Sequence, residues 1–175
     1  MTGPISEFLI GDHRRIAELL ARARAGDSAA YDELRGALLR HIGIEEKILL
    51  RAIRARAGEA RRSDPTNDAG GHGDEPSLAI RLRRDHSAIA AMLVPPPSPE
   101  LLARLAELLA LHDPLEEGES GLYAHADELL ADDPDIVERM RQAPIPPLAP
   151  NFAGERAYLA IEELVARAAA ARRKA

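Results

Sequence analysis

Four histidines and two glutamates occupy regular positions on stretches that otherwise carry an apolar helical pattern. In "LLRHIGIEEKIL" (38–49), His41 and Glu45 lie four residues apart, and in "LAELLALHDPLEE" (105–117) His112 and Glu116 have the same spacing. On a helix, this spacing places both side chains on one face, a turn apart. Imidazole nitrogens combined with carboxylate oxygens are suitable ligands for iron, zinc or manganese. The two motifs therefore predict a metal site.

The position of Glu45 supports the same prediction. It lies on the apolar stripe of its helix, together with Leu38, Ile42 and Leu49. A buried carboxylate without a partner lowers the free energy of unfolding by an amount comparable with the whole stability of a domain. A divalent cation bound between helices would compensate for that cost. The chain has no cysteine, so thiolates take no part in the predicted site.

The two motifs belong to an internal repeat. "DHRRIAELL" (12–20) matches "DHSAIAAML" (85–93), and "LRGALLRHIGIEE" (34–46) matches "LAELLALHDPLEE" (105–117). A duplicated helical hairpin predicts an all-α fold, an up-down four-helix bundle of two repeated hairpins, in whose core equivalent positions meet. The predicted metal ligands are His13, His41, Glu45, His86, His112 and Glu116.

The helices that must position these ligands follow from the periodicity of the apolar residues. We expect helices over 5–25, 29–57, from 76 or 77 to 94, and from 100 onward, the last irregular in its second half because of Pro114, Gly118 and Gly121. Residues 58–75 should form a flexible loop, in which His72 has no particular role. The bundle should span 1–131, followed by a C-terminal extension over 132–175. That extension should contain a short element near 133–142, a Pro-rich linker and an extra helix over about 152–172 that packs on the outside.

Composition argues against several classes of protein. The formal net charge of −6 argues against nucleic acid as a partner. No stretch of 18 consecutive apolar residues is present, which argues against a membrane-spanning protein, and the N-terminus lacks the pattern of a signal peptide. A cytoplasmic location is therefore expected. With 46% apolar residues, the chain should fold around a core.

The order His, HxxxE, His, HxxxE, over residues 13 to about 123, resembles the hemerythrin-like (HHE cation-binding) domain. The resemblance implies two iron ions, each held by two histidines and bridged by both glutamates and an oxo or hydroxo group. It also implies a non-haem di-iron protein that binds or reacts with dioxygen, hydrogen peroxide or nitric oxide. If the protein is an enzyme, the expected activity is peroxide decomposition, similar to that of a catalase or peroxidase.

The chain departs from the oxygen-carrying members that it resembles. Those proteins have a second histidine four residues after the one equivalent to His86, where this chain has Ala90. They also place the last acidic ligand five residues after the histidine, which here is Glu117, whereas Glu116 is at four. One iron would then hold water or another side chain such as a tyrosine. An open position favours reaction with small oxidants over reversible carriage.

Several alternatives remain open at the level of sequence. Tyr123 either joins the site or packs with its hydroxyl group toward solvent, and Glu117 and Glu119 are rivals of Glu116. His125 is expected at the surface. Two other functions are possible. One is a regulatory or interaction protein with a structural or sensory metal, whose protein partner the sequence does not indicate. The other is an iron-handling protein, which the absence of a Cys-containing segment disfavours.

Overall fold

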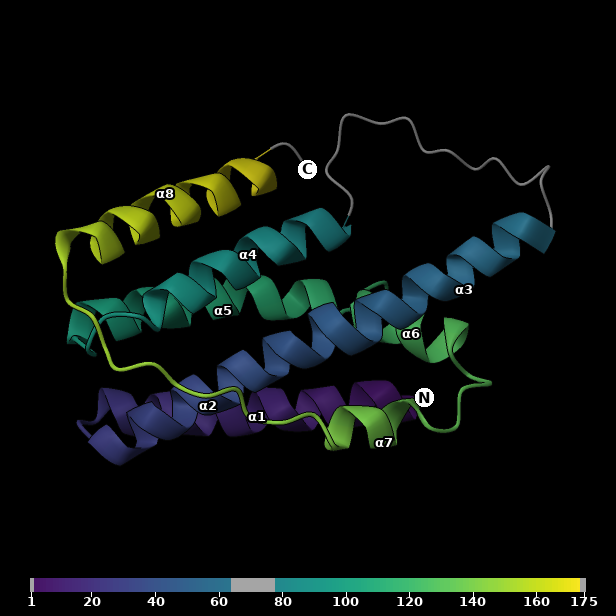
Figure 1. Ribbon diagram of the computed structural model, residues 1–175, viewed down its shortest axis with the longest axis horizontal. Helices are drawn as coiled ribbons and strands as arrows, with labels where there is room; N and C mark the ends of the chain where they lie inside the picture. Colours follow the sequence, from purple (N-terminus) through teal and green to yellow (C-terminus); the bar gives the residue numbers. More distant parts are fainter. Residues whose placement is uncertain (1, 64–77, 174–175) are drawn as a thin grey trace.

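A computed structural model describes residues 2–63 and 78–173, and within these ranges the chain is helical, with no strand (Figure 1). The predicted all-helical class is therefore confirmed. Within the same ranges, every helix is too short or too polar to cross a lipid bilayer. The elements are α1 (Pro4–Arg24), α2 (Ser28–Ile44), the π-helical turn η1 (Glu45–Leu49), α3 (Leu50–Ser63), α4 (Leu78–Met92), α5 (Pro99–Glu117), α6 (Leu122–Leu129), α7 (Ile136–Arg141) and α8 (Glu155–Arg172).

The long helices pack in pairs around a buried interior. Helix α1 lies along α2 and also contacts α5 and α6, while α4 contacts α5, α8 and, to a smaller extent, α2. The turn between α1 and α2 falls in the gap between the helices predicted over 5–25 and 29–57. Gly26 adopts a positive φ of 96°, and the Asp27 side chain accepts a hydrogen bond from the backbone N–H of Ala30 at 3.0 Å. This cap fixes the start of α2.

The core consists of two apolar clusters separated by a layer of buried polar residues. On α1, Leu9 belongs to one cluster and Ile16 to the other, and His13 lies between them. Each of the other helices of the interior also has a histidine between a residue of one cluster and a residue of the other: Leu38, His41, Ile44 on α2; Leu82, His86, Ile89 on α4; and Leu108, His112, Leu115 on α5. Apolar packing on both sides thus fixes the depth of the polar layer.

The segment predicted as one helix over 29–57 is continuous but not uniform. It contains the π-helical turn η1, and α3 continues to Ser63. The prediction of a loop from residue 58 is therefore wrong for residues 58–63. Residues 64–77, with His72 and the predicted start of the next helix, lie outside the described ranges. A π-helical turn inserts an extra residue and occurs often at functional sites, and this one begins at Glu45.

The irregular second half predicted for the helix after residue 100 is confirmed as a break. Helix α5 contains Pro114 and ends at Glu117, and α6 begins at Leu122. A Cβ atom on Gly121 would lie 2.5 Å from the backbone oxygen of Glu116, so only glycine allows the chain to return this closely. Asp127 on α6 then accepts hydrogen bonds from the backbone N–H groups of Ile5 and Ser6 at 2.8 and 3.2 Å, which ties α6 to the start of α1.

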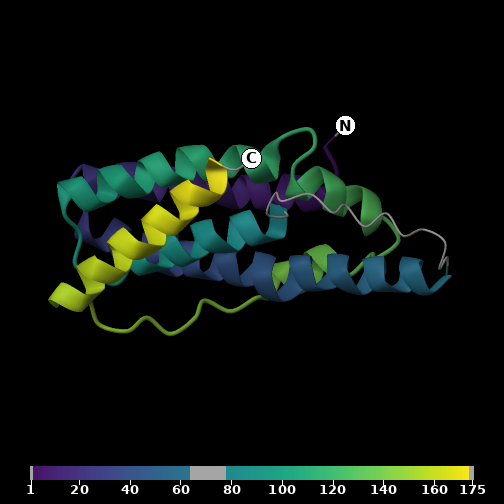
Figure 2. The same ribbon diagram turned by 90° about the horizontal axis from the view of Figure 1, so that it is seen from above.

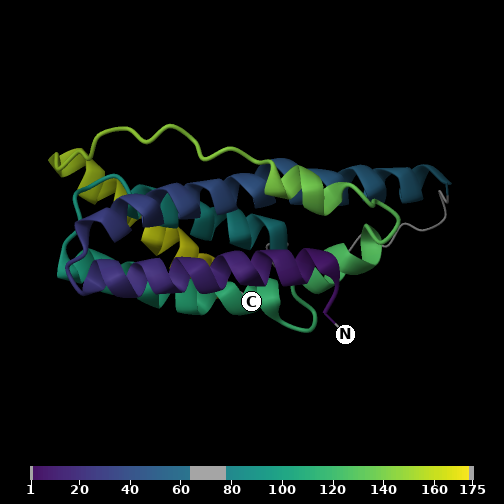
Figure 3. The same cartoon turned by 90° about the horizontal axis from the view of Figure 1, so that it is seen from below.

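The chain after α6 crosses the body of the molecule before its last helix. Helices α7 and α8 correspond to the predicted elements near 133–142 and 152–172. The extended segment between them runs over α2, where Arg35 donates a hydrogen bond to the backbone oxygen of Ala149 at 2.8 Å (Figure 3). Helix α8 then lies along α4 (Figure 2) and buries Ile161, Ala168 and Ala171.

Candidate metal centre

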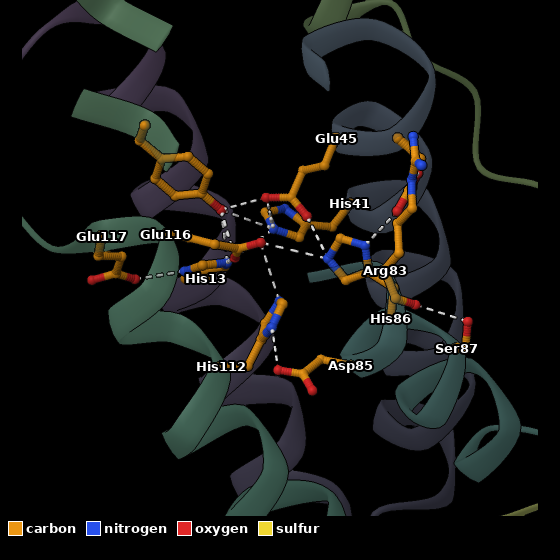
Figure 4. Close-up of polar contacts among 12 residues, drawn as sticks. His13, His41, Glu45, Arg83, Asp85, His86, Ser87, His112, Glu116 and Glu117 are labelled. Atoms are coloured by element: carbon orange, nitrogen blue, oxygen red, sulfur yellow. Dashed lines mark hydrogen bonds and ion pairs between the residues drawn. The ribbon is translucent and has the colours of Figure 1, made fainter. Parts of the chain in front are cut away.

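All six residues predicted as metal ligands lie together in the polar layer (Figure 4). The side chains come from α1, α2, η1, α4 and α5, and both glutamates are 0% exposed. They form two overlapping groups, each with ligand atoms within 4.8 Å of one another: His13, His41, Glu45 and Glu116; and Glu45, His86, His112 and Glu116. The two groups share both glutamates. This arrangement could hold a metal ion.

The Nε2 atoms of the histidines point toward the two carboxylates. His41 Nε2 lies 3.3 Å from Glu45 Oε1, and His112 Nε2 lies 3.1 Å from Glu116 Oε1, so the two HxxxE pairs are formed within their own helices. His86 Nε2 reaches both carboxylates, at 3.1 Å from Glu45 Oε2 and 3.5 Å from Glu116 Oε1. Each carboxylate therefore lies between imidazoles from different helices, as a bridging ligand would.

Several of these inward-facing atoms lack a hydrogen bond of acceptable geometry. Within the described part of the chain, Glu45 Oε2, Glu116 Oε1 and His86 Nε2 are buried without a hydrogen-bond partner. His13 Nε2 lies only 2.9 Å from His41 Nε2, and two such nitrogens cannot both carry a proton along that line. Lone pairs that face one another at these distances need a proton or a metal ion between them. The donor atoms thus fit a metal ion.

A carboxylate also lies behind each histidine, next to its Nδ1 atom. Within each repeat, the aspartate that precedes one histidine faces the other: Asp12 Oδ2 is 3.7 Å from His41 Nδ1, and Asp85 Oδ2 is 3.3 Å from His112 Nδ1. An Nδ1–H group donating to a carboxylate, as at His112, fixes the tautomer that leaves Nε2 free for a metal. The 3.7 Å separation at His41 exceeds a hydrogen bond, and among the described residues His41 Nδ1 has no hydrogen-bond partner, so Asp12 acts on it through charge alone.

The other two histidines are supported from the opposite repeat. Glu46 Oε1 is 3.0 Å from His86 Nδ1, and Glu117 Oε1 is 2.5 Å from His13 Nδ1. All four supporting carboxylates come from the repeated "DH" and "EE" pairs of the sequence. The sequence did not predict this supporting role for any of the four, since Glu117 was considered only as a rival ligand of Glu116, although the repeat contains the signal.

Three arginines hold these supporting carboxylates in turn. Arg40 Nη1 lies 3.1 Å from Asp12 Oδ2, and Arg83 Nε donates to Glu46 Oε2 at 3.0 Å. Arg172 Nη2, from α8, lies 2.7 Å from Asp85 Oδ1. The C-terminal helix therefore contacts the residue that orients His112, a connection that the sequence did not predict.

Tyr123 lies inside the centre. Its side chain is 1% exposed, and its hydroxyl group donates to Glu45 Oε1 at 2.6 Å and lies 3.1 Å from Glu116 Oε2. The same oxygen is 3.0 Å from His13 Nε2. The alternative in which this hydroxyl group faces solvent is therefore wrong.

The two rivals of Glu116 lie elsewhere. Glu117 faces the outer nitrogen of His13, together with Asp113. Glu119 is exposed, beyond the end of α5, and belongs to none of the ligand groups found in the described residues. His125 is exposed, as predicted.

Without a metal, the centre forms a network of ion pairs. Burial alone would lower the pKa values of the histidines, but nearby carboxylates outweigh it and raise the pKa to about 10 for His41, about 11 for His86 and about 9 for His112. Burial and the Glu116 carboxylate oppose ionisation of Glu45, yet His41 and His86 lower its pKa to about 2. Burial and the two carboxylates raise the pKa of Tyr123 well above its usual value.

The role of Asp85 can be tested by Asp85→Asn, which keeps the shape of the side chain and removes its charge. Because Asp85 is 2% exposed and faces both His112 and Arg172, we expect metal affinity to fall by about 10–100-fold. Equilibrium titration of the metal-free protein would measure this. Asp32→Asn is the control, since the Asp32 side chain is 70% exposed. Equal affinities in the two variants would contradict an orienting role for Asp85.

Comparisons with protein-family models, with curated proteins and with solved structures gave no significant match.

Proposed function

We propose that this chain is a hemerythrin-like protein, an up-down four-helix bundle that binds two iron ions and reacts with small oxidants. The observation that carries the proposal is the pair of overlapping ligand groups that share Glu45 and Glu116. Two shared carboxylates and two histidines on each side suit a pair of ions better than one tetrahedral ion. The internal repeat supports the bundle, because it relates His13 to His86 and His41 to His112.

Iron suits the donor set. Mixed imidazole and carboxylate ligands with no sulfur disfavour copper(I) and suit iron, zinc or manganese. The resemblance to hemerythrin-like domains selects iron among these metals. Two divalent ions and the two shared carboxylates leave a small residual charge, and the four supporting carboxylates lower it further.

Each residue of the centre has a distinct role in this proposal. The histidines hold the ions through Nε2, and the carboxylates behind them fix the orientation of the rings. Tyr123 presents its hydroxyl oxygen between both glutamates and would become a further ligand of bound iron once it loses its proton. Iron bound here would supply electron transfer and a coordination position for dioxygen, hydrogen peroxide or nitric oxide.

A sensory role is the second candidate, and it is supported by the contact between Arg172 on α8 and Asp85. A change of metal or ligand at His112 would alter its contact with Asp85 and, through the ion pair of Asp85 with Arg172, the position of helix α8. In that role the iron would report a small oxidant without turning it over. Turnover experiments separate the two functions, because a sensor binds its ligand without sustained consumption.

The test of the proposed function is the amount of iron bound after anaerobic loading with Fe(II) and desalting. We expect about two ions per chain, one for each ligand group. The reduced protein should then change its visible absorption on exposure to dioxygen, hydrogen peroxide or nitric oxide. One ion per chain would restrict the site to one ligand group, and no ion bound to folded protein would contradict the proposal.

Metal binding should release protons. Near pH 7 the raised pKa values of His41, His86 and His112 keep these rings protonated, and each must lose the proton on Nε2 before it can bind a metal. We expect release of about three protons per chain on full loading, so the apparent affinity should rise with pH. Calorimetric titrations in buffers of different ionisation enthalpy would count them. Binding without proton release would exclude histidine ligation.

Tyr123→Phe tests whether the phenol contacts the ions. Because the hydroxyl oxygen lies within 3.1 Å of ligand atoms of Glu45, Glu116 and His13, we expect the oxidised iron protein to show a phenolate charge-transfer band that the variant lacks. Iron content should stay near two, since six other ligands remain. Tyr158→Phe, at an exposed position, is the control. An unchanged spectrum would limit Tyr123 to hydrogen bonding.

A further inference from the structure

A cavity of about 200 Å³ lies next to the polar layer, between α1, α2, α4 and α5. Most of its wall is apolar, with Ile16, Leu38 and Ile89 among the lining side chains. Two exposed alanines also line it, Ala17 on α1 and Ala110 on α5. The cavity therefore reaches the surface between these two helices, where small side chains leave the way open.

The inner wall of the cavity is one face of the candidate metal centre. His13, His41 and His112 line it, whereas Glu45, Glu116 and Tyr123 are not among the described residues around it. The cavity is thus separate from the space between the two carboxylates, and it borders the centre only at the histidine rings. A molecule bound there would lie against the histidine rings.

The size of the cavity exceeds what a two-atom ligand needs. Apolar cavities of about 150 Å³ stay dry and can bind benzene. A space of about 200 Å³ therefore accommodates an organic molecule of benzene size with a small substituent. Dioxygen, nitric oxide or hydrogen peroxide would leave most of the apolar wall without contacts.

Two residues that line the cavity, Asp113 and His41, each have a buried polar atom without a hydrogen-bond partner among the described residues, and only the carboxylate of Asp113 offers a charged acceptor. Asp113 lines the cavity, and its Oδ1 atom is buried without a hydrogen-bond partner among the described residues. A carboxylate oxygen accepts hydrogen bonds, and leaving a buried acceptor unpaired is costly. A ligand that fits this wall would combine an apolar body with one O–H donor.

We propose that this cavity binds a small apolar alcohol or organic hydroperoxide, whose O–H group donates to Asp113 while its hydrocarbon part fills the space between α1 and α5. The two compound types share the donor and the apolar body, and they differ by one oxygen atom. The alcohol is the unreactive member of the pair, so binding can be measured without any redox chemistry. The proposal concerns binding alone and does not depend on the identity of the metal.

The experiment titrates the full chain, metal-free and zinc-loaded, with benzyl alcohol, toluene and glycerol, followed by ligand-detected NMR and calorimetry. We expect saturable binding of benzyl alcohol, about 10-fold tighter than toluene because of the hydrogen bond to Asp113 and much tighter than glycerol because of apolar burial. Asp113→Ala should bring benzyl alcohol and toluene to within about 2-fold of each other. Cumene hydroperoxide should compete with benzyl alcohol for the site.

Two variants test whether the ligand binds inside the cavity. Ala106→Phe fills part of the space, and Ala110→Phe narrows the exposed end; each should weaken benzyl alcohol by about 10-fold or more. Ala166→Phe, at an exposed position on α8, is the matched control and should have no effect. If Ala106→Phe fails to fold, Ala110→Phe decides, since its side chain projects to solvent. Absence of saturable binding, or binding unchanged by these cavity variants, would overturn the proposal. Because metal content is measured separately, that failure would leave the proposed iron site untouched.

Discussion

Replacing Glu45 by alanine is expected to reduce iron from about two ions per chain to well below one. Both ligand groups contain this carboxylate, so its removal takes one ligand from each ion at the same time. A histidine variant removes a ligand from one group only. The loss in Glu45→Ala should therefore exceed the loss in His112→Ala. Iron analysis of anaerobically loaded and desalted protein measures both.

The control for this variant is Glu119→Ala. Glu119 is an exposed acidic residue that follows the second HxxxE motif, and its removal should leave about two ions per chain. If the iron content is unchanged in Glu45→Ala, Glu45 does not bridge two ions, and the proposed di-iron site is contradicted.

A network of ion pairs without any metal is the competing explanation of the cluster. In that case Glu45→Ala would still destabilise the protein, by roughly 3–5 kcal/mol, because protonated histidines would lose a buried partner. Stability of the metal-free variant alone therefore does not distinguish the explanations. The distinguishing quantity is the increase in the free energy of unfolding when metal is added. If the cluster binds metal, the unmodified protein shows this increase and Glu45→Ala loses it. If the cluster is only an ion-pair network, neither protein shows it.

The sequence predicts the ligand set because the repeat and the helical period act together. His13 and His86 follow the same "DH" pair, and apolar residues three or four positions away on both sides fix which face of the helix is buried. Burial and convergence of six polar side chains follow from those two features. The all-helical class follows from the same periodicity.

The features that the sequence does not predict depend on contacts between distant segments. The π-helical turn at Glu45 leaves no clear mark on the apolar pattern, and the return of the chain at Gly121 that brings Tyr123 inward depends on a backbone contact with Glu116. The contact of Arg172 with Asp85 depends on how α8 packs on α4. The sequence of α8, an Ala-rich helix with a few polar residues, does not indicate that packing. Long-range packing decides all three.

Metal loading should strongly raise the thermal stability of the protein. An ion present at 1,000 times its dissociation constant adds about 4 kcal/mol to the free energy of unfolding, and about 1 kcal/mol shifts the Tm of a domain of this size by roughly 2–4 °C. Two ions should therefore raise the Tm by roughly 15–30 °C. Scanning calorimetry with and without metal measures the shift.

The shift should also widen as pH rises, because the two forms respond in opposite ways. The raised pKa values of His41, His86 and His112 stabilise the metal-free protein fully below about pH 6.5, and this contribution is lost as pH rises toward about 9–11. The lowered pKa of Glu45 contributes above about pH 4.5 and is lost only in acid. Metal binding instead strengthens with pH, because protons no longer compete for Nε2. The difference in Tm between loaded and metal-free protein should therefore be larger at pH 8.5 than at pH 6. A difference that is constant or shrinks over this range would mean that the added metal binds at surface carboxylates and not at the buried histidines.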